Sequence, residues 1–362
     1  MGTGSTYTEL LKGKRRYDIA TIKEVAKRAR VSVGTVSNVL CGVPSVRVEL
    51  RERVEAAIRK LDYHPNHVAR SLKSKQTKTL GMVISDITNP FFPLMVRGAE
   101  DAASARGYFL ITFNTDDRIE RERQVLSLLR SRRVDGVLLV VAPNSDASHI
   151  ERLVDDGIPI VCIDRIPNSR KIFDSVCVDN VKGAQTCVQH LIMRGHTRIA
   201  IITGSLSLQT ARERLKGYEL ALAEAGLEVD RELALEGDFR QESGLRLGKD
   251  LLLRHRRPTA LFVSNGMMTV GVLEALEEMG LSCPNDVALA TFDDLPFAKV
   301  FHPHLTSVSQ PCYQIGYQGA DLLLKRVRSE LSGQGPVTVR LLPELKIRES
   351  TASLPPVLPR AL

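Results

Sequence analysis

The sequence contains no tryptophan, and only 5% of its 362 residues are aromatic. Its hydrophobic fraction of 43% is therefore mainly aliphatic, which favours a globular α/β protein with a large core. No apolar run is long enough to span a bilayer, and residues 1–20 lack the apolar centre of a signal peptide. We therefore expect a soluble protein that stays in the cytoplasm and has no membrane contact.

Metal-binding and catalytic signatures are also missing. The six cysteines form no CxxC pair, and most lie in apolar runs such as IPIVCID, where a thiol acts as a small hydrophobic group. His190 and His196 flank the LIMRG segment at a spacing that does not build a metal site, and we expect His196 to serve as a cap or to satisfy a buried carbonyl. No acid–base pair or nucleophile occurs at a recognisable spacing. The sequence thus predicts no cofactor, no metal and no enzyme activity.

Negative charge is scarce in the N-terminal segment. Residues 1–78 carry 17 Lys and Arg against 7 Asp and Glu, a net charge of +10. The remainder carries 33 against 35, so the whole-chain excess of +8 belongs to that segment. This asymmetry indicates contact with nucleic acid or an anionic membrane, although solvated surface charge would give the same composition.

Residues 21–64 have the pattern of a helix-turn-helix domain. Ile22–Ala29 repeats apolar residues at helical spacing, and Ser32 is a good N-cap for a second helix over Val33–Leu40. A third helix is predicted after Ser45. The pattern predicts an all-α DNA-binding domain, but three packed helices also occur as ordinary bundles.

The second helix leaves Val33, Gly34, Ser37 and Asn38 on its outer face. The amide of Asn38 can pair with two edge atoms of an adenine, and the hydroxyls of Ser32 and Ser37 can reach phosphates or base edges. These residues are the expected readers of a DNA sequence.

Short segments flank this domain. Residues 1–20 are polar and basic, which favours a flexible arm over a minor-groove contact. Residues 65–78 begin with Pro65 and Asn66, and Asn66 can cap a short helix before a basic linker. Residues 351–362 form a Pro-rich tail.

From residue 79 onward, apolar runs alternate with amphipathic helices. Buried parallel strands are expected at 80–85, 108–114, 135–142, 158–164, 198–204, 259–265 and 287–293. Helices are expected at 92–106, 118–132, 146–156, 210–225, 241–255, 267–279 and 313–331. Two such series predict a doubly wound, two-lobed α/β domain over 79–350 with a cleft between the lobes. The first lobe would take about 79–177 plus 311–338, and the second about 178–306 plus 339–349.

Long sequence strings identify the chain as a member of the lactose/galactose repressor (LacI/GalR) family. TIKEVAKRA, TVSNVL and the run from RERV to YHPNHVARSL resemble the family's DNA-binding domain over about fifty residues. SDITNPFF, RVDGVLL, RGHTRIAIITG and FDDLPFA resemble its regulatory domain, which shares a periplasmic-binding-protein-like architecture. The resemblance implies a ligand-responsive homodimeric repressor that binds a pseudo-palindromic operator on double-stranded DNA.

In the family, a hinge helix folds on the operator, and a leucine that matches Leu72 enters the minor groove and kinks the duplex. Lys73 would meet minor-groove edges or phosphate beside it. A simple amphipathic contact between Leu72 and the third helix is the alternative. The DNA-binding residues that we expect are Thr21, Ser32, Val33, Gly34, Ser37, Asn38, Asn66, Arg70, Leu72 and Lys73.

Three positions depart from the family pattern. Arg30 stands at a turn position where relatives usually have Gly or Asn, so a left-handed backbone there would be strained. Val33 and Gly34 offer only apolar or backbone contact, which places more of the base recognition on Asn38.

Polar residues follow several expected strands, where a doubly wound fold binds its ligands. Carboxylates, amides and Arg suit a polyol, and Phe rings can stack on the apolar face of a sugar. The residues expected to bind the effector, some from the resemblance, are Asp86, Asn89, Phe91, Phe92, Asp164, Arg214, Phe239, Asn265, Asp293 and Gln310. Asn114 and Arg165 also follow strands. Relatives have an Asn-Asp pair where this chain has Asn265-Gly266, so one carboxylate is missing.

Each residue also has a structural alternative, such as a helix cap for Asp293, an ion pair for Arg214 or core packing for the Phe rings. The effector is expected to be a sugar or sugar derivative, with a nucleobase as the alternative. The competing functions are a solute-binding protein and a sugar-processing enzyme built on the same lobes.

Overall fold

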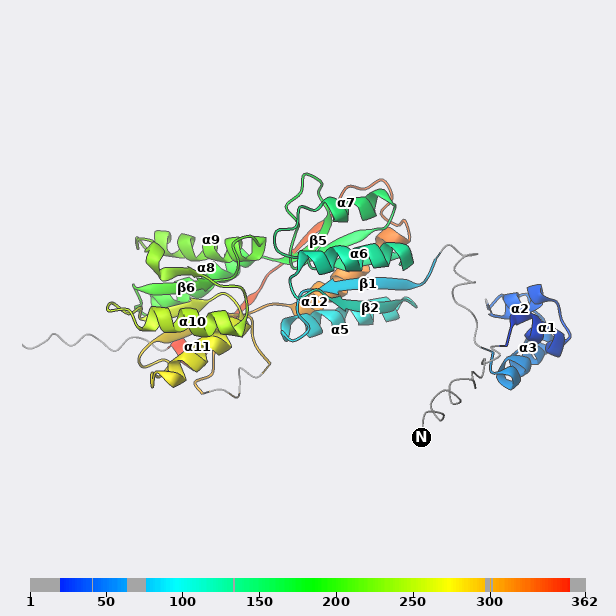
Figure 1. Cartoon of the computed structure of the whole chain (residues 1–362), viewed down its shortest axis with the longest axis horizontal. Coiled ribbons are helices and arrows are strands. Elements are labelled where there is room, and N and C mark those ends of the chain that lie inside the picture. Colours follow the sequence, from blue (N-terminus) through cyan, green and yellow to red (C-terminus); the bar gives the residue numbers. More distant parts are fainter. Residues whose placement is uncertain are drawn as a thin grey trace, which may run out of the picture. The chain divides into compact units, whose positions relative to one another are not determined.

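A computed structural model of the chain contains two compact units, residues 1–77 and 78–362, which we describe separately (Figure 1). The structure describes residues 20–40, 42–63, 76–132, 134–296, 300 and 302–351. The expected hinge helix, the expected N-terminal arm and the Pro-rich tail therefore lie almost entirely outside the described residues.

The described part of the N-terminal unit, residues 20–40, 42–63 and 76–77, contains three helices around a small core. They are α1 (Ile22–Ala29), α2 (Val33–Leu40) and α3 (Val48–Leu61). Val25, Val36 and Val54, one from each helix, are fully buried in this core. The helix-turn-helix predicted from the sequence is confirmed.

Local capping explains where these helices begin and end. The Thr21 side chain accepts from the Glu24 backbone and the Glu24 carboxylate accepts in return, which makes a capping box. Ser32 Oγ accepts from the Thr35 backbone at 3.0 Å, so the predicted N-cap is confirmed. Arg30 has φ of 50°, the left-handed backbone expected at this turn. Arg53 stabilises the turn, because its Nη2 donates to the carbonyls of Ala29 and Arg30.

The first lobe is built on a parallel six-stranded sheet of order β11-β5-β4-β3-β1-β2. Its strands are β1 (Thr79–Ile84), β2 (Phe109–Asn114), β3 (Gly136–Leu139), β4 (Ile160–Ile163), β5 (Asp174–Val178) and β11 (Thr338–Leu341). Its helices are α5 (Phe91–Ser104), α6 (Ile119–Arg132), α7 (Ser148–Asp155) and α12 (Cys312–Val327). Side chains alternate along β1, so Met82 packs with the α5 core and Val83 with the α6 core.

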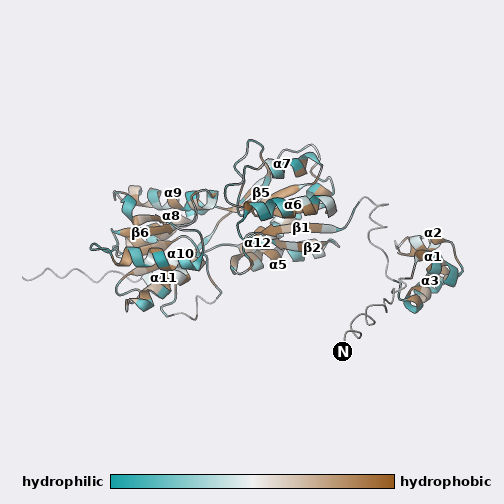
Figure 2. Cartoon of the chain, viewed as in Figure 1, coloured by the Kyte–Doolittle hydropathy of each residue, from teal (hydrophilic) through white to brown (hydrophobic). Residues whose placement is uncertain are grey.

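The second lobe has a sheet of order β12-β10-β9-β8-β6-β7, in which only the β10–β12 pair is antiparallel. Its strands are β6 (Ile199–Thr203), β7 (Ala234–Glu236), β8 (Ala260–Val263), β9 (Ala288–Phe292), β10 (Thr306–Ser309) and β12 (Glu344–Lys346). Its helices are α8 (Asn180–Met193), α9 (Gln209–Glu224), α10 (Gln241–Leu252) and α11 (Gly266–Glu278), with short 3-10 turns η1 (Arg231–Leu233) and η2 (Glu349–Thr351). Figure 2 shows the strands of both lobes as largely hydrophobic, while the helices carry hydrophilic residues.

The chain passes between the lobes three times. It crosses between β5 and α8, between β10 and α12, and between β11 and β12. The third crossing comes later than expected, because Val339 in β11 pairs with Val176 in β5 of the first sheet. Residues 339–341 therefore belong to the first lobe and not to the second.

The doubly wound, two-lobed α/β architecture expected from the sequence is confirmed. Strands β5, β7, β10, β11 and β12 and helix α8 were not predicted. Within the described ranges, no helix is long and apolar enough to cross a bilayer.

Candidate functional site

Helix α2 presents the residues expected to read DNA. Val33 is 42% exposed, Gly34 and Asn38 are also exposed, and Ser37 is half-buried. Val36, on the opposite face, is fully buried against α1 and α3. The outer face of α2 therefore has the composition expected from the sequence, with Asn38 as its exposed amide.

The two capping residues are exposed but already hydrogen-bonded. Thr21 Oγ1 donates to Glu24 Oε2 at 3.0 Å, and Ser32 Oγ lies 2.9 Å from Thr35 Oγ1. Each marks a helix N-terminus, where backbone N–H groups favour an anion such as a phosphate. The remaining expected DNA contacts, Asn66, Arg70, Leu72 and Lys73, lie outside the described residues.

A buried site lies between the two lobes of the second unit. It contains nine of the ten residues predicted to bind an effector, from seven separate stretches of chain. The cavity is lined by Asn89, Phe91, Phe92, Asp164, Arg165, Thr210, Arg214, Phe239, Asn265, Asp293 and Gln310.

Asp86 is the exception, because it is not among the residues that line this cavity. Its carboxylate accepts from the Thr88 backbone at 2.9 Å and from the Thr88 hydroxyl at 2.6 Å. This turn follows β1 and leaves Asp86 outside the residues that line the cavity. Position after a strand was too weak a signal, because a short polar residue there also stabilises a turn.

Two lining residues were not among the predicted ones. Arg165 comes directly after Asp164 at the end of β4, so its position after a strand could have predicted that it lines the site. Thr210, in the first turn of α9, carries no such signal because it lies among other small polar residues.

The first-lobe half of the site is a buried group of opposite charges. Arg165 Nη1 donates to Asp117 Oδ1 at 2.6 Å and to Ser85 Oγ at 3.0 Å. Arg165 Nε is 3.6 Å from Asp164 Oδ2 and has no hydrogen-bond partner among the described residues. Burial raises the pKa of Asp164 to about 6, although Arg165 and Arg214 act to lower it.

Arg214 organises the second-lobe half. Its Nε donates to Asn180 Oδ1 at 2.9 Å and its Nη1 to the Ser264 carbonyl at 2.6 Å. The guanidinium carbon lies 3.8 Å from the centre of the Phe292 ring, a cation–π contact. Burial lowers the pKa of Arg214, while Asp293 and Asp164 act to raise it. The surface ion pair considered from the sequence is excluded, because Arg214 is 4% exposed.

Asn265 and Asp293 are held by the starts of neighbouring elements. Asn265 Oδ1 caps α11 by accepting from Met268, and its Nδ2 donates to the Phe239 carbonyl at 3.0 Å. Asp293 Oδ2 accepts from the Gly266 backbone at 3.2 Å. A Cβ atom at Gly266 would overlap the Leu295 side chain. Glycine at 266 therefore makes room for Leu295, and its N–H bonds Asp293.

The backbone at this site is strained. Asp164, Phe239 and Asp293 have φ of 64°, 69° and 81°, in the left-handed region that non-glycine residues rarely adopt. Such conformations cost on the order of 1–3 kcal/mol each and are concentrated at functional sites. Their presence at three cavity residues supports a binding role for this region.

The Phe239 ring lines the cavity beside the two guanidinium groups. Its ring centre lies 5.9 Å from the Arg165 guanidinium carbon and 5.8 Å from that of Arg214. The cavity that remains has a volume of about 30 Å³, which is room for roughly one water molecule. A sugar-sized ligand therefore requires the lobes to separate or the Phe239 ring to turn.

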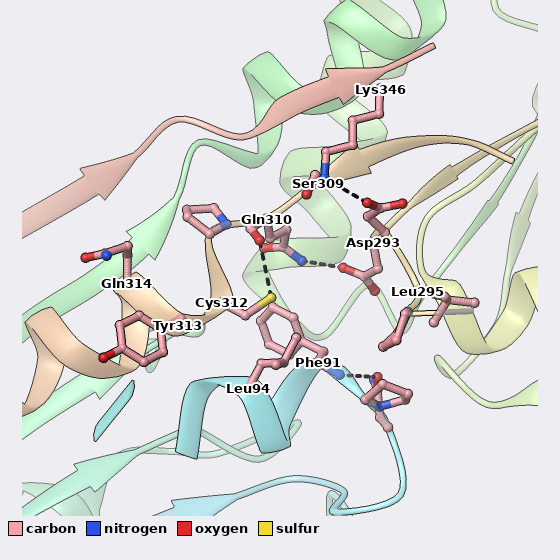
Figure 3. Close-up of a pocket in the computed structure, with 15 residues that line it drawn as sticks. Phe91, Leu94, Asp293, Leu295, Ser309, Gln310, Cys312, Tyr313, Gln314 and Lys346 are labelled. Carbon is pink, nitrogen blue, oxygen red and sulfur yellow. Dashed lines mark hydrogen bonds and ion pairs between the residues drawn. The ribbon is translucent and has the colours of Figure 1, made fainter. Parts of the chain in front are cut away.

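A larger cavity of about 370 Å³ adjoins this site (Figure 3). It lies between the start of α5, the segment after β9 and the crossing segment that leads into α12. Phe91, Asp293 and Gln310 line both cavities. Figure 3 shows Gln310 and Asp293 joined by a hydrogen bond. The volume of this adjoining cavity is in the range of small-molecule sites.

Two polar contacts bridge the lobes beside the site. Arg240 Nη2, from the second lobe, donates to the Asp116 carbonyl of the first lobe at 3.1 Å. Arg340 Nη1 in β11 lies 3.9 Å from Glu213 Oε1 in α9. Both contacts would break if the lobes separated.

The two histidines considered from the sequence have structural partners. His190 Nε2 lies 2.8 Å from the Thr351 hydroxyl, and His196 Nδ1 lies 3.0 Å from the Thr259 hydroxyl. The partner of His196 Nδ1 is thus a hydroxyl, where a carbonyl was expected.

Two family models match the chain. Residues 21–66 match the model described as "Bacterial regulatory proteins, lacI family". Residues 188–351 match the model described as "Periplasmic binding protein-like domain". The first match covers the three helices, and the second covers most of the second lobe and α12.

Relatives of known function resemble the chain over nearly its whole length. The HTH-type transcriptional repressor PurR of Erwinia tasmaniensis is 38% identical over 93% of this chain and 98% of its own. The ribose operon repressor of Escherichia coli K12 is 38% identical over 85% of this chain and 93% of its own. A solved structure of the lac repressor dimer bound to operator and the anti-inducer ONPF matches the chain with a TM-score of 0.81. It is 27% identical, over 92% of this chain and 99% of that one.

Proposed function

Because the chain belongs to the lacI family of bacterial regulatory proteins, we propose that it is a transcriptional repressor controlled by a small effector. The single observation that carries the effector part is the gathering of nine predicted residues around one cavity between the lobes. The relatives are repressors, and we infer that this chain likewise binds ligands without transforming them.

The DNA-binding part rests on α2. Asn38 is exposed on its outer face and would pair with an adenine in the major groove. Val33, with its 42% exposed side chain, would contact a thymine methyl group. Because α2 offers few polar groups, base recognition depends mainly on Asn38, and residues 65–78 would supply minor-groove contacts through Leu72 and Lys73.

A homodimer presents two copies of α2 to the two halves of a pseudo-palindromic operator. The lac repressor, which this chain resembles, was solved as a dimer on its operator. The edge strand β2 exposes Phe109 and Ile111. We assign this apolar surface of the first lobe to the dimer interface.

The charges of the site favour a neutral polyol over an anion. Arg165 is already paired with Asp117, and Arg214 faces Asp164 and Asp293. Among the described residues, Arg165 Nε is a buried donor and Gln310 Oε1 a buried acceptor without hydrogen-bond partners. Sugar hydroxyls both donate and accept, so one ligand can satisfy both atoms. Phe91, Phe92 and Phe239 supply apolar surface for the ring.

The mechanism couples opening of the cleft to the DNA-binding unit. The effector enters when the lobes separate, and its bonds to both halves then stabilise one lobe angle over the other. A change in lobe angle would shift the dimer surface of the first lobe and the hinge segment that follows the DNA-binding domain. The expected coupling free energy is about 1–3 kcal/mol.

A ligand screen tests this proposal. Thermal unfolding of the full-length protein is measured with sugars, sugar acids, sugar phosphates and nucleobases, because a ligand of the folded state raises the Tm. Neutral sugars are expected to raise it. If only nucleobases raise the Tm, the effector is a nucleobase and not a sugar. If a ligand binds without changing the operator affinity, the repressor model is contradicted.

Deleting residues 1–78 distinguishes the competing functions. A solute-binding protein or an enzyme would keep its full activity without them. The repressor would keep effector binding and lose operator binding. Turnover of any sugar that binds would refute the ligand-binding model.

A further inference from the structure

Three side chains with metal-ligating atoms converge on the surface of the second lobe. His302 and His304 precede β10, and Glu349 lies in η2, 45 residues after His304. One ligand atom of each lies within 4.8 Å of those of the other two. His304 Nδ1 is 2.9 Å from Glu349 Oε2, and the two imidazole ring centres are 5.0 Å apart.

The backbone that carries His304 and Glu349 is firmly held. The Ser350 backbone donates to the His304 carbonyl at 3.0 Å, and the His304 backbone donates to Glu349 Oε2 at 3.0 Å. Thr306 Oγ1 donates to the Arg348 carbonyl at 3.0 Å and accepts from the Arg348 backbone at 2.9 Å. The two segments are therefore joined on both sides of the cluster.

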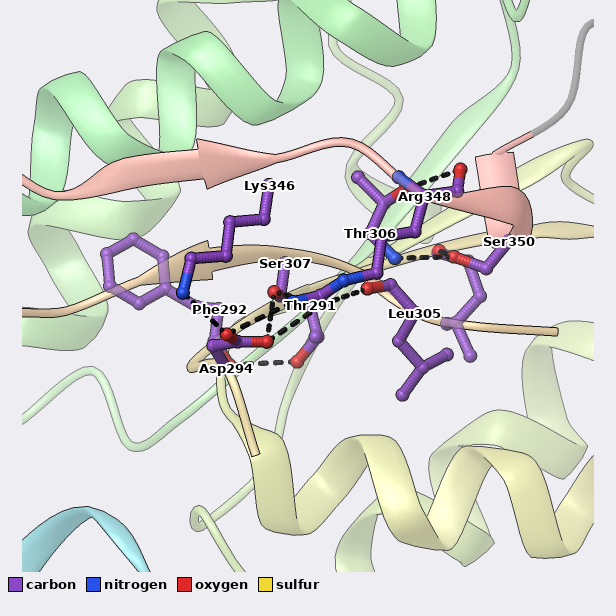
Figure 4. A network of polar contacts seen from close by, with 10 residues as sticks. Thr291, Phe292, Asp294, Leu305, Thr306, Ser307, Lys346, Arg348 and Ser350 are labelled. Carbon is purple, nitrogen blue, oxygen red and sulfur yellow. Dashed lines mark hydrogen bonds and ion pairs between the residues drawn. The ribbon is translucent and has the colours of Figure 1, made fainter. Parts of the chain in front are cut away.

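A partly buried ionic network adjoins this junction (Figure 4). Arg348 Nη1 and Nη2 donate to the two carboxylate oxygens of Asp294 at 2.8 and 3.1 Å, and Lys346 Nζ donates at 2.9 Å. Burial acts to raise the pKa of Asp294, but the hydrogen bonds from Arg348, Lys346 and Ser307 outweigh it and lower the pKa to about 2. Asp294 thus remains charged and anchors the strand that leads to Glu349.

The three side chains themselves can move. The side chain of His304 is 33% exposed and that of Glu349 60% exposed, and His302 is also exposed. Small side-chain rotations on a fixed backbone would bring the three atoms to the spacing of a metal's ligands.

We propose that His302, His304 and Glu349 form a surface binding site for a divalent ion of the zinc class. Two imidazoles and one carboxylate are a preferred donor set for Zn²⁺, whereas Mg²⁺ and Ca²⁺ prefer oxygen alone. Three protein ligands leave one position for water. The ion would cross-link the segment before β10 to the segment after β12, which are 45 residues apart. That distance hides the site from an inspection of the sequence, in which the histidines have no third ligand nearby.

Zinc binding is measured on the full-length protein without a histidine tag, by competition with a chromophoric chelator. The wild type is expected to bind one Zn²⁺ per chain with high affinity. H304A and E349Q should each weaken that affinity by about tenfold or more, since each removes one of three ligands. H255A is the matched control, because His255 is an exposed histidine elsewhere in the same lobe and should leave the affinity unchanged.

Thermal unfolding gives a second readout. Zn²⁺ should raise the Tm of the wild type and of H255A but not that of E349Q, the conservative variant, and Mg²⁺ should shift none of them. Wild-type zinc affinity in the double variant H304A/E349Q would overturn the site, as would loss of binding in H255A. The proposal does not depend on the identity of the effector or the operator.

Discussion

Gln310 Nε2 donates to Asp293 Oδ1 at 2.5 Å, and this bond connects a carboxylate that lines the cavity to a segment that crosses between the lobes. Asp293 ends β9 in the second lobe, while Gln310 lies between β10 and α12 of the first lobe. Both residues line the small and the large cavity. A ligand that competes for Asp293 would therefore act directly on the chain that joins the lobes.

The raised pKa of Asp164 makes the stability of the protein depend on pH. Its folded-state pKa is about 6, against an ordinary value of 3.8, so between these pH values the folded protein binds more protons than the unfolded chain. The free energy of unfolding therefore falls as pH rises from about 4 to 6, and this whole decrease in stability persists above pH 6. Asp164→Asn should stabilise the protein by roughly 1–3 kcal/mol at pH 7.5 and by little at pH 4.

Urea unfolding at both pH values measures this difference. Asp155→Asn is the control, because the Asp155 side chain is exposed and pairs only at the surface with Lys171. An equal effect of Asp164→Asn at pH 4 and pH 7.5 would contradict the assignment of a buried, protonatable carboxyl at this position.

Asn38 should determine one base pair in each half of the operator. Asn38→Ala removes the only exposed amide of α2, and a lost bidentate contact costs about 1–3 kcal/mol of discrimination. Operator selection from a random library should show relaxed preference at one position per half-site. Glu55→Gln on the exposed surface of α3 is the control. An unchanged sequence preference in the Asn38 variant would refute this contact.

Phe109 tests the dimer surface. Its side chain is 72% exposed on the edge strand β2, and a carboxylate there would have to be desolvated on association. Phe109→Asp should shift the protein toward monomer in sedimentation equilibrium and weaken operator binding, since two half-sites are then no longer bound together. Ile172→Asp is the matched control, because the Ile172 side chain is 73% exposed in the same lobe and the same charge is introduced. If both variants remain dimeric, the interface lies elsewhere.

The N-terminal helices could be predicted because their signals are local. Ser32 and Thr21 cap the helices that follow them, and Arg30 takes the left-handed turn expected from its position. Capping depends on residues within three positions of the helix start, so the sequence alone determines it.

The missed elements depend on distant partners. Asp174 opens β5 although strands disfavour Asp, because its carboxylate accepts from Arg326 at 2.7 and 2.9 Å. Helix α8 contains Asn180 and Gly183, which weaken its helical pattern, and it is stabilised by packing against α9. These tertiary contacts override local propensity.

The candidate site was predictable in its residues but not in its shape. Positions after strands and the family resemblance identified nine lining residues, and the same reasoning also selected Asp86, which does not line the cavity. The left-handed backbone of Asp164 and Phe239, and the small volume left beside the Phe239 ring, follow from the packing of two lobes. A single sequence does not reveal either.

A ligand bound at Arg214 is expected to change the affinity of the protein for its operator. Measuring the operator affinity with and without the effector tests this coupling most directly. In the wild type, a saturating effector from the ligand screen should change the operator Kd by roughly 5–150-fold, in either direction. Arg214→Ala, and the milder Arg214→Gln if the first does not fold, should keep the effector-free operator Kd and lose the change. An intact effector response in a folded Arg214 variant would contradict the account.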